Sequence, residues 1–137
     1  GEVPYLPLEE TTAEKFDQLL AAKARAPFLV LQGAITLMQR TGVDGTIIVT
    51  IGGTGADGPR TVAAAAGRGA LAALAQGFAA SVAGSRIRVF GLVIDDERTG
   101  SAATPHDVAR AVADLASGAS PAAPGSITFA PGTVAAG

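Results

Sequence analysis

The sequence has no cysteine and only one histidine, His106. Without cysteine, the chain cannot form a disulfide, a thiolate metal site or a cysteine nucleophile. With one histidine, it cannot build a metal site from several imidazoles or a catalytic triad that draws on another histidine. These absences remove the most recognisable kinds of metal and nucleophilic chemistry from consideration.

Strong charge and long apolar runs are also missing. The net charge is -2 and the ten basic residues are scattered, so the electrostatic signature of a nucleic-acid-binding protein is absent. No apolar run reaches transmembrane length, and no signal-peptide pattern opens the chain. We expect one cytoplasmic domain, residues 1–137, that contacts neither nucleic acid nor membrane. Because the first residue is glycine, we also expect a processed or truncated start.

The stretch from Asp44 to Ile94 organises the rest of the chain. Residues 45–51 are β-branched and apolar at most positions, which is typical of an internal parallel strand. A glycine-rich turn (52–59), an alanine-rich helical run (61–83) and a second apolar run (86–94) follow. Parallel strands need a crossover of about this size, so the stretch predicts a β-α-β unit.

The residues before this unit predict a helix over 11–40. Thr11 or Thr12 is suited to its N-cap, and the apolar spacing stops at Thr41-Gly42. Pro27 lies inside the pattern, which predicts a kink or break near residues 24–26.

The residues after the unit predict one more helix and one more strand. Residues 95–101 form a polar loop, and Thr104 and Pro105 begin a helix. Residues 118–125 read as a linker before a short strand over 126–130. The order of elements predicts an α/β fold with a mainly parallel three-stranded sheet.

Six stretches resemble one known family in their order and spacing: residues 6–17, 45–51, 68–71, 87–89, 104–109 and 125–132. They are similar to the C-terminal half of a short-chain dehydrogenase/reductase. The resemblance implies a partial Rossmann-like three-layer sandwich with a mainly parallel sheet. It also implies that the family's N-terminal dinucleotide-binding strands, with their glycine fingerprint, are absent from this chain.

The catalytic positions of the family carry other residues here. The family relays a proton through an Asn, a Ser, a Tyr and a Lys. By the resemblance these positions fall, in that order, on Lys23, on Gly52 or Gly53, on Ala64 and on Arg68. Neither a methyl group nor a glycine hydrogen transfers a proton, and the only tyrosine, Tyr5, precedes the helix. The resemblance therefore implies a degenerate active site without confident catalytic or cofactor-binding residues.

Other chemistry has weaker support. Asp95, Asp96 and Glu97 follow a strand, where carboxylates can hold Mg²⁺ or act as an acid-base pair. We favour a solvated loop here, because the sequence shows no partner ligand. His106 lies in a helix's first turn, where we expect it to be exposed. The glycine turn over 52–58 lacks dinucleotide-binding spacing, so we interpret it as a connection, and we expect no metal site.

Three functions remain open. The first is a non-catalytic relative that acts through protein contacts, because residues 46–51 would form an exposed apolar edge and helices 11–40 and 61–83 resemble the family's dimer interface. It predicts a homo-oligomer or a complementary subunit, and no cofactor on this chain alone. The second is an NAD(P)-dependent oxidoreductase whose nucleotide-binding half is missing or supplied by another chain. The third is a small lyase or cyclase that uses Asp95 or Asp96.

Overall fold

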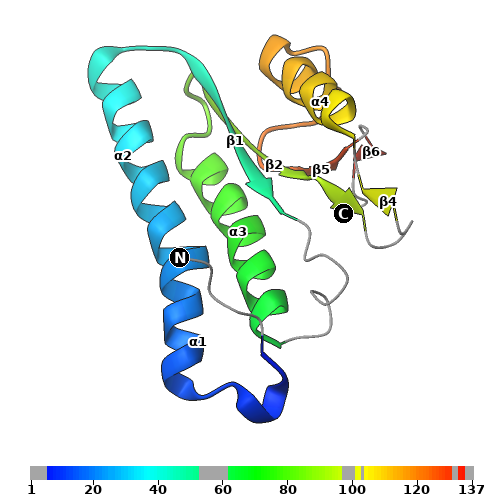
Figure 1. The fold of residues 1–137 in the computed structure, drawn as a ribbon. Coiled ribbons are helices and arrows are strands. Elements are labelled where there is room, and N and C mark those ends of the chain that lie inside the picture. The colour runs from blue at the N-terminus through cyan, green and yellow to red at the C-terminus, as the bar shows by residue number, and fades with distance from the viewer. Residues whose placement is uncertain (1–5, 53–61, 97–100, 103, 131–132, 135–137) are drawn as a thin grey trace.

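In the computed structural model, the continuous β-branched runs form the centre of a parallel sheet. The structure describes residues 6–52, 62–96, 101–102, 104–130 and 133–134. The main sheet has the strand order β1-β2-β5-β6 (Figure 1). The elements are, in chain order, η1 (Leu8–Glu10), α1 (Ala13–Leu20), η2 (Ala21–Arg25), α2 (Ala26–Thr41), β1 (Gly45–Ile51), α3 (Val62–Ser81), β2 (Ile87–Val93), β3 (Asp95–Asp96), β4 (Ser101–Ala102), α4 (Pro105–Ser117), β5 (Ile127–Phe129) and β6 (Thr133–Val134).

The register of the sheet is set by β1 and β2, which pair in parallel along their whole length. Gly45 lies opposite Ile87, and Ile51 lies opposite Val93. The shorter β5 pairs in parallel with the second half of β2, from Gly91 onward. The expected α/β fold with three parallel strands is therefore confirmed.

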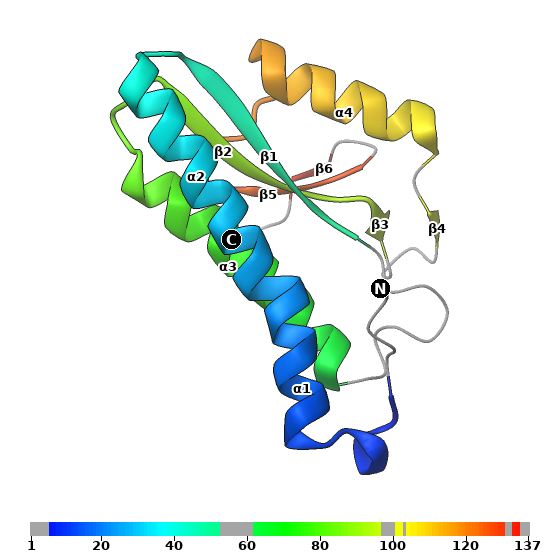
Figure 2. The ribbon, with the colours of Figure 1, turned by 60° about the vertical axis from the view of Figure 1, so that its left-hand side comes forward.

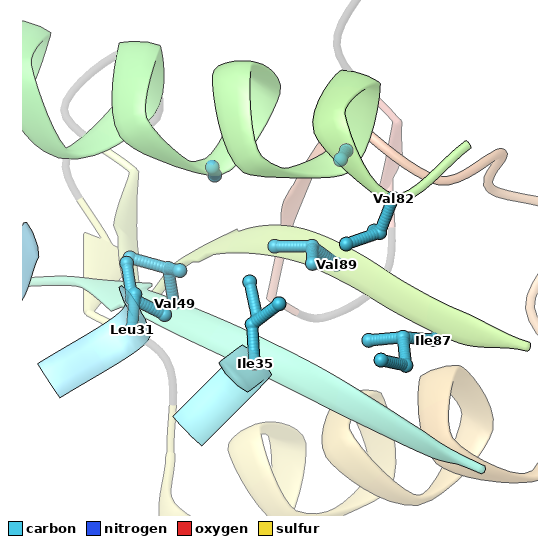
Figure 3. Close-up of a cluster of buried hydrophobic side chains, with 8 residues drawn as sticks. Leu31, Ile35, Val49, Val82, Ile87 and Val89 are labelled. Carbon is cyan, nitrogen blue, oxygen red and sulfur yellow. The ribbon is translucent and has the colours of Figure 1, made fainter. Parts of the chain in front are cut away.

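Helices cover both faces of this sheet (Figure 2). On one face, α2 and α3 enclose an apolar cluster with the first two strands, shown in Figure 3; it consists of Leu31, Ile35, Val49, Ala75, Ala79, Val82, Ile87 and Val89. On the other face, α4 covers a second cluster of Leu92, Ala111 and Ala130. The layers are helices, sheet and helix, so the expected three-layer sandwich is confirmed.

Small side chains let α3 lie close to the sheet. Ala75 is completely buried, and a Cβ added to Gly91 on β2 would be 3.6 Å from the Cβ of Ala75. The close approach depends on the alanine and glycine content of α3. Its glycines weaken the intrinsic helix propensity, whereas its alanines favour the helix. No helix in the described parts of the chain is both long and apolar enough to cross a bilayer.

Arg88 connects the C-terminal end of α4 to the N-terminal ends of β1 and β2. The Arg88 guanidinium on β2 donates hydrogen bonds to the Thr46 hydroxyl at 2.8 Å and to the Ala116 carbonyl at 3.1 Å. Its guanidinium also lies 5.7 Å from the centre of the Phe90 ring, within the range of a cation–π contact. Arg88 thereby joins two strands and the end of a helix.

The helix ends follow the expected capping chemistry. The Thr12 hydroxyl accepts a hydrogen bond from the Lys15 amide, and Gly42 ends α2 with a φ of 68°. At α4, Thr104 and Asp107 form a reciprocal capping box. Hydrogen bonds from Thr104 lower the pKa of Asp107, so its ionised carboxylate stabilises the helix at neutral pH. This contribution is lost as the pH falls through the lowered pKa.

The structure corrects the predicted pattern in three places. Near residues 24–26, where a kink or break was expected, the structure has the π-helical turn η2 between α1 and α2, and Pro27 lies in the first turn of α2. The segment predicted as a polar loop contains the short antiparallel pair β3 and β4. Beyond the predicted last strand, β6 returns antiparallel to β5.

The turn into β5 supplies a stability test. Gly125 has a φ of +88°, and an added Cβ would be 3.3 Å from the Cβ of Ala79. Gly125→Ala is expected to lower the free energy of unfolding by about 1–2 kcal/mol, because alanine is strained in the left-handed region. Gly77→Ala in α3 is the matched control, because no heavy atom lies within 4 Å of its added Cβ. It should raise stability by about 0.5–1 kcal/mol.

Urea denaturation followed by circular dichroism measures both variants. Equal stability changes of the same sign would contradict the structure of this turn.

Candidate functional site

The parallel strands β1 and β2 end side by side, and such sheets bind ligands at this end. β1 is followed by Gly52, and β2 by Ile94 and Asp95. The turn η2 and the helix α3 pack against each other beside the end of β1. In a Rossmann-like fold, a ligand site is expected at this end of the sheet.

A surface pocket, here called the edge pocket, lies beside the end of β1 and has a volume of about 440 Å³. This volume lies within the range of small-molecule sites, about 300–1,000 Å³. The lining is mainly apolar, with Lys23 as its only charged residue. It consists of Ala22, Lys23, Ala26, Pro27, Val30, Leu31, Val49, Thr50 and Leu71.

Gly67 on α3 has no side chain and so leaves room for Lys23 to pack against the helix. The stem of Lys23 packs against Gly67, where an added Cβ would be 3.2 Å from the Lys23 Cβ and 3.4 Å from its Cγ. Lys23 is the central residue of η2, and π-helical turns are often found at functional sites. Lys23, which the resemblance predicts at the family's asparagine position, therefore lines the edge pocket, with its stem packed against α3.

The other family positions are only partly brought together. Arg68 directly follows Gly67 on α3 and is half-buried, with its Nε shielded from solvent. Ala64 is four residues earlier in the same helix, so the two positions share a helical face. Gly52 is exposed just after β1, whereas Gly53 lies outside the described residues, as does Tyr5.

The structure describes the alternative site residues only in part. His106 is exposed at the start of α4, as expected. Asp95 and Asp96 are the two residues of the strand β3, and Glu97 lies outside the described residues. Among the side chains that the structure describes, no three His, Cys, Asp or Glu residues are placed to hold a metal ion. The carboxylate hypothesis stays a prediction.

Residues 3–94, about two thirds of the chain, match the model of a family described as enoyl-(acyl carrier protein) reductase. The chain belongs to the short-chain dehydrogenase/reductase family. The expected family relationship is thereby confirmed.

Solved structures of this family share the fold. A 4-hydroxyisoleucine dehydrogenase complexed with NADH and succinate is 20% identical, with a TM-score of 0.76 over 97% of this chain and 65% of its own. A 3-ketoacyl-(acyl-carrier-protein) reductase from Brucella melitensis, complexed with NADH, is 21% identical, with a TM-score of 0.70 over 91% and 60%.

A promiscuous reductase that catalyses keto-reduction at C1 during lugdunomycin biosynthesis is 27% identical, with a TM-score of 0.67 over 93% and 55%. The chain thus spans less than two thirds of the length of these structures. No curated protein sequence matches it.

The contact between η2 and α3 can be tested with a matched pair of substitutions. Gly67→Val inserts a branched side chain against Lys23, whereas Gly69→Val, two residues further along α3, adds a Cβ with no heavy atom within 4 Å. Gly67→Val is expected to lower the free energy of unfolding by about 1–3 kcal/mol more than Gly69→Val, because overpacking displaces η2. Chemical denaturation of both variants measures the difference. An equal effect would show that Lys23 does not pack against α3.

Proposed function

We propose that this short-chain dehydrogenase/reductase domain is not catalytic by itself and acts through contacts with a second copy or a complementary subunit. The observation that carries the proposal is alanine at position 64, where the family's tyrosine acts as the proton donor. A methyl group neither donates nor accepts a proton. The rest of the relay is altered as well, because glycine stands at the serine position.

The two cationic residues do not replace the missing acid. An arginine side chain keeps its proton in proteins, so Arg68 is suited to binding negative charge and not to proton transfer. The stem of Lys23 is packed against Gly67 and lines an apolar pocket. In this proposal, Lys23 and Arg68 give the site positive charge but do not transfer a proton.

The surface of the helices supports a role in association. The helices α1, η2, α2 and α3 lie on one side of the sheet (Figure 2), with a groove of about 460 Å³, here called the helix groove. It is lined by Asp17, Leu20, Ala21, Ala24, Arg25, Phe28 and Leu74. Phe28 and Phe78 form a ring contact at 5.7 Å beside it, and Phe28 and Leu29 remain partly exposed. An apolar surface of this kind is typical of a protein contact.

The alternative function is an NAD(P)-dependent oxidoreductase whose nucleotide-binding half is supplied by another segment or chain. Two of the similar solved structures contain NADH, which favours this cofactor if that half is present. We expect no cofactor on this chain alone. We place the protein in the cytoplasm in both cases.

Titration with NADH and NADPH separates the two functions. We expect no change in nucleotide fluorescence at micromolar protein, and no oxidation of either nucleotide with a panel of ketones and 3-ketoacyl thioesters. The Brucella melitensis reductase serves as the positive control. Micromolar binding together with turnover that Arg68→Ala abolishes would overturn the proposal.

A further inference from the structure

A second surface pocket lies at the end of the sheet opposite the candidate site, beside the C-terminal end of α3. Its volume is about 470 Å³, within the range of small-molecule sites. Its lining comes from the end of α3 and the turn after it, from the start of β2, and from Pro124 and Gly125 before β5. It is here called the α3-end pocket.

The lining of this pocket does not include β1. Among the residues that the structure describes, it is built from α3, β2 and the segment before β5. In the sheet, β2 separates β1 from β5. The form of the pocket therefore does not depend on what lies beside β1.

The floor of the α3-end pocket is apolar. Ala79, Val82 and Ile87 line it, and each belongs to the core cluster drawn in Figure 3, with at most 6% of its surface exposed. A ligand in the pocket would contact the core directly, and burial of its apolar surface would favour binding. We therefore expect a ligand with an apolar body.

Hydrogen bonds hold the rim of the pocket in place. The Ser85 hydroxyl donates to the Val82 carbonyl at 2.6 Å and accepts from the Ile87 amide at 3.1 Å. Before β5, the Gly125 amide donates to the Val89 carbonyl at 2.8 Å. A rim that is formed before the ligand arrives lowers the entropic cost of binding.

Arg88 is the one charged residue in the lining, among those that the structure describes. Its hydrogen bonds to Thr46 and to the Ala116 carbonyl both come from Nη2, so within the described residues Nη1 and Nε keep their donors for another acceptor. Apart from the adjacent chain, a Cβ added to Gly118 would have Nη1 as its one neighbour within 4 Å, at 3.8 Å, so open space adjoins this nitrogen. A guanidinium held in this way is suited to a carboxylate.

Neighbouring groups leave this positive charge in place. Asp44, directly before β1, forms an ion pair with Arg86 at 3.2 Å and so does not neutralise Arg88. The C-terminal end of a helix such as α3 carries a partial negative charge of only about half a unit. Three carbonyls near this end already accept hydrogen bonds, those of Phe78, Ala80 and Val82. A negatively charged ligand is thus favoured over a positively charged one.

We propose that the α3-end pocket binds a small aliphatic carboxylate. The apolar body of the ligand lies on Ala79, Val82 and Ile87, and its carboxylate accepts hydrogen bonds from Arg88. This site goes beyond the proposed function and does not depend on it, because its lining shares no residue with the edge pocket or the helix groove.

Titration of the unmodified chain at neutral pH with hexanoate, hexanol and hexylamine, followed by amide chemical shifts, tests the proposal. Hexanoate should give saturable shifts at the amides of Gly84 and Gly125, which line the pocket, and none at Ile51, at the other end of the sheet. Hexanol lacks the charge, so its dissociation constant should be about tenfold higher. Equal affinity for the three compounds, tighter binding of hexylamine, or shifts that do not saturate would overturn the proposal.

A matched pair of variants locates the ligand. Ala80 lines the pocket and is exposed, so the fold should tolerate Ala80→Leu, whose larger side chain should abolish the saturable shifts. Ala73→Leu should leave them unchanged, because Ala73 lies seven residues earlier on the same face of α3, is also exposed and is outside the lining. Binding that survives Ala80→Leu, or that is lost with Ala73→Leu, would contradict the proposal.

Two substitutions of Arg88 separate its charge from its role in joining the strands to α4. Arg88→Lys keeps a positive charge and should bind hexanoate more tightly than Arg88→Gln, which removes it, although both lose the guanidinium. Equal affinity of the two variants would count against a charge-assisted contact. Failure of any of these tests leaves the non-catalytic function standing, because the nucleotide titration tests that function separately.

Discussion

The unbroken parallel pairing of β1 with β2 is the constraint on which the rest of the structure depends. It brings the ends of both strands together, where the site of a Rossmann-like fold is expected. It also fixes which backbone groups of β1 are used within the sheet and which point outward. A shift of one residue would exchange the two faces and separate Val49 from the helices.

Small residues let the helices pack closely against this sheet. Ala75 lets α3 approach β2, and Gly67 lets the stem of Lys23 lie against α3. The same helix carries Ala64, where the family uses tyrosine. The helix that packs against the sheet thus also carries Ala64 and Arg68, the two positions that the resemblance assigns to the family's tyrosine and lysine.

Much of the fold was predictable because its signals are local. Continuous β-branched runs indicated β1 and β2, and Thr12 and Thr104 marked the helix starts through capping chemistry. The π-helical form of η2 was not predictable, because Pro27 is compatible with several ways of interrupting a helix. The edge pocket was missed as well, since residues from η2, α2, β1 and α3 meet only through tertiary packing. The family resemblance identified Lys23 as a site position, but its contact with Gly67 required the structure.

The short strand β6 lies at the far edge of the main sheet, beyond β5. It consists of two residues and runs antiparallel to its neighbour, so it offers little backbone to another strand. In the described part of the chain, this end of the sheet is therefore poorly suited to extension by another strand.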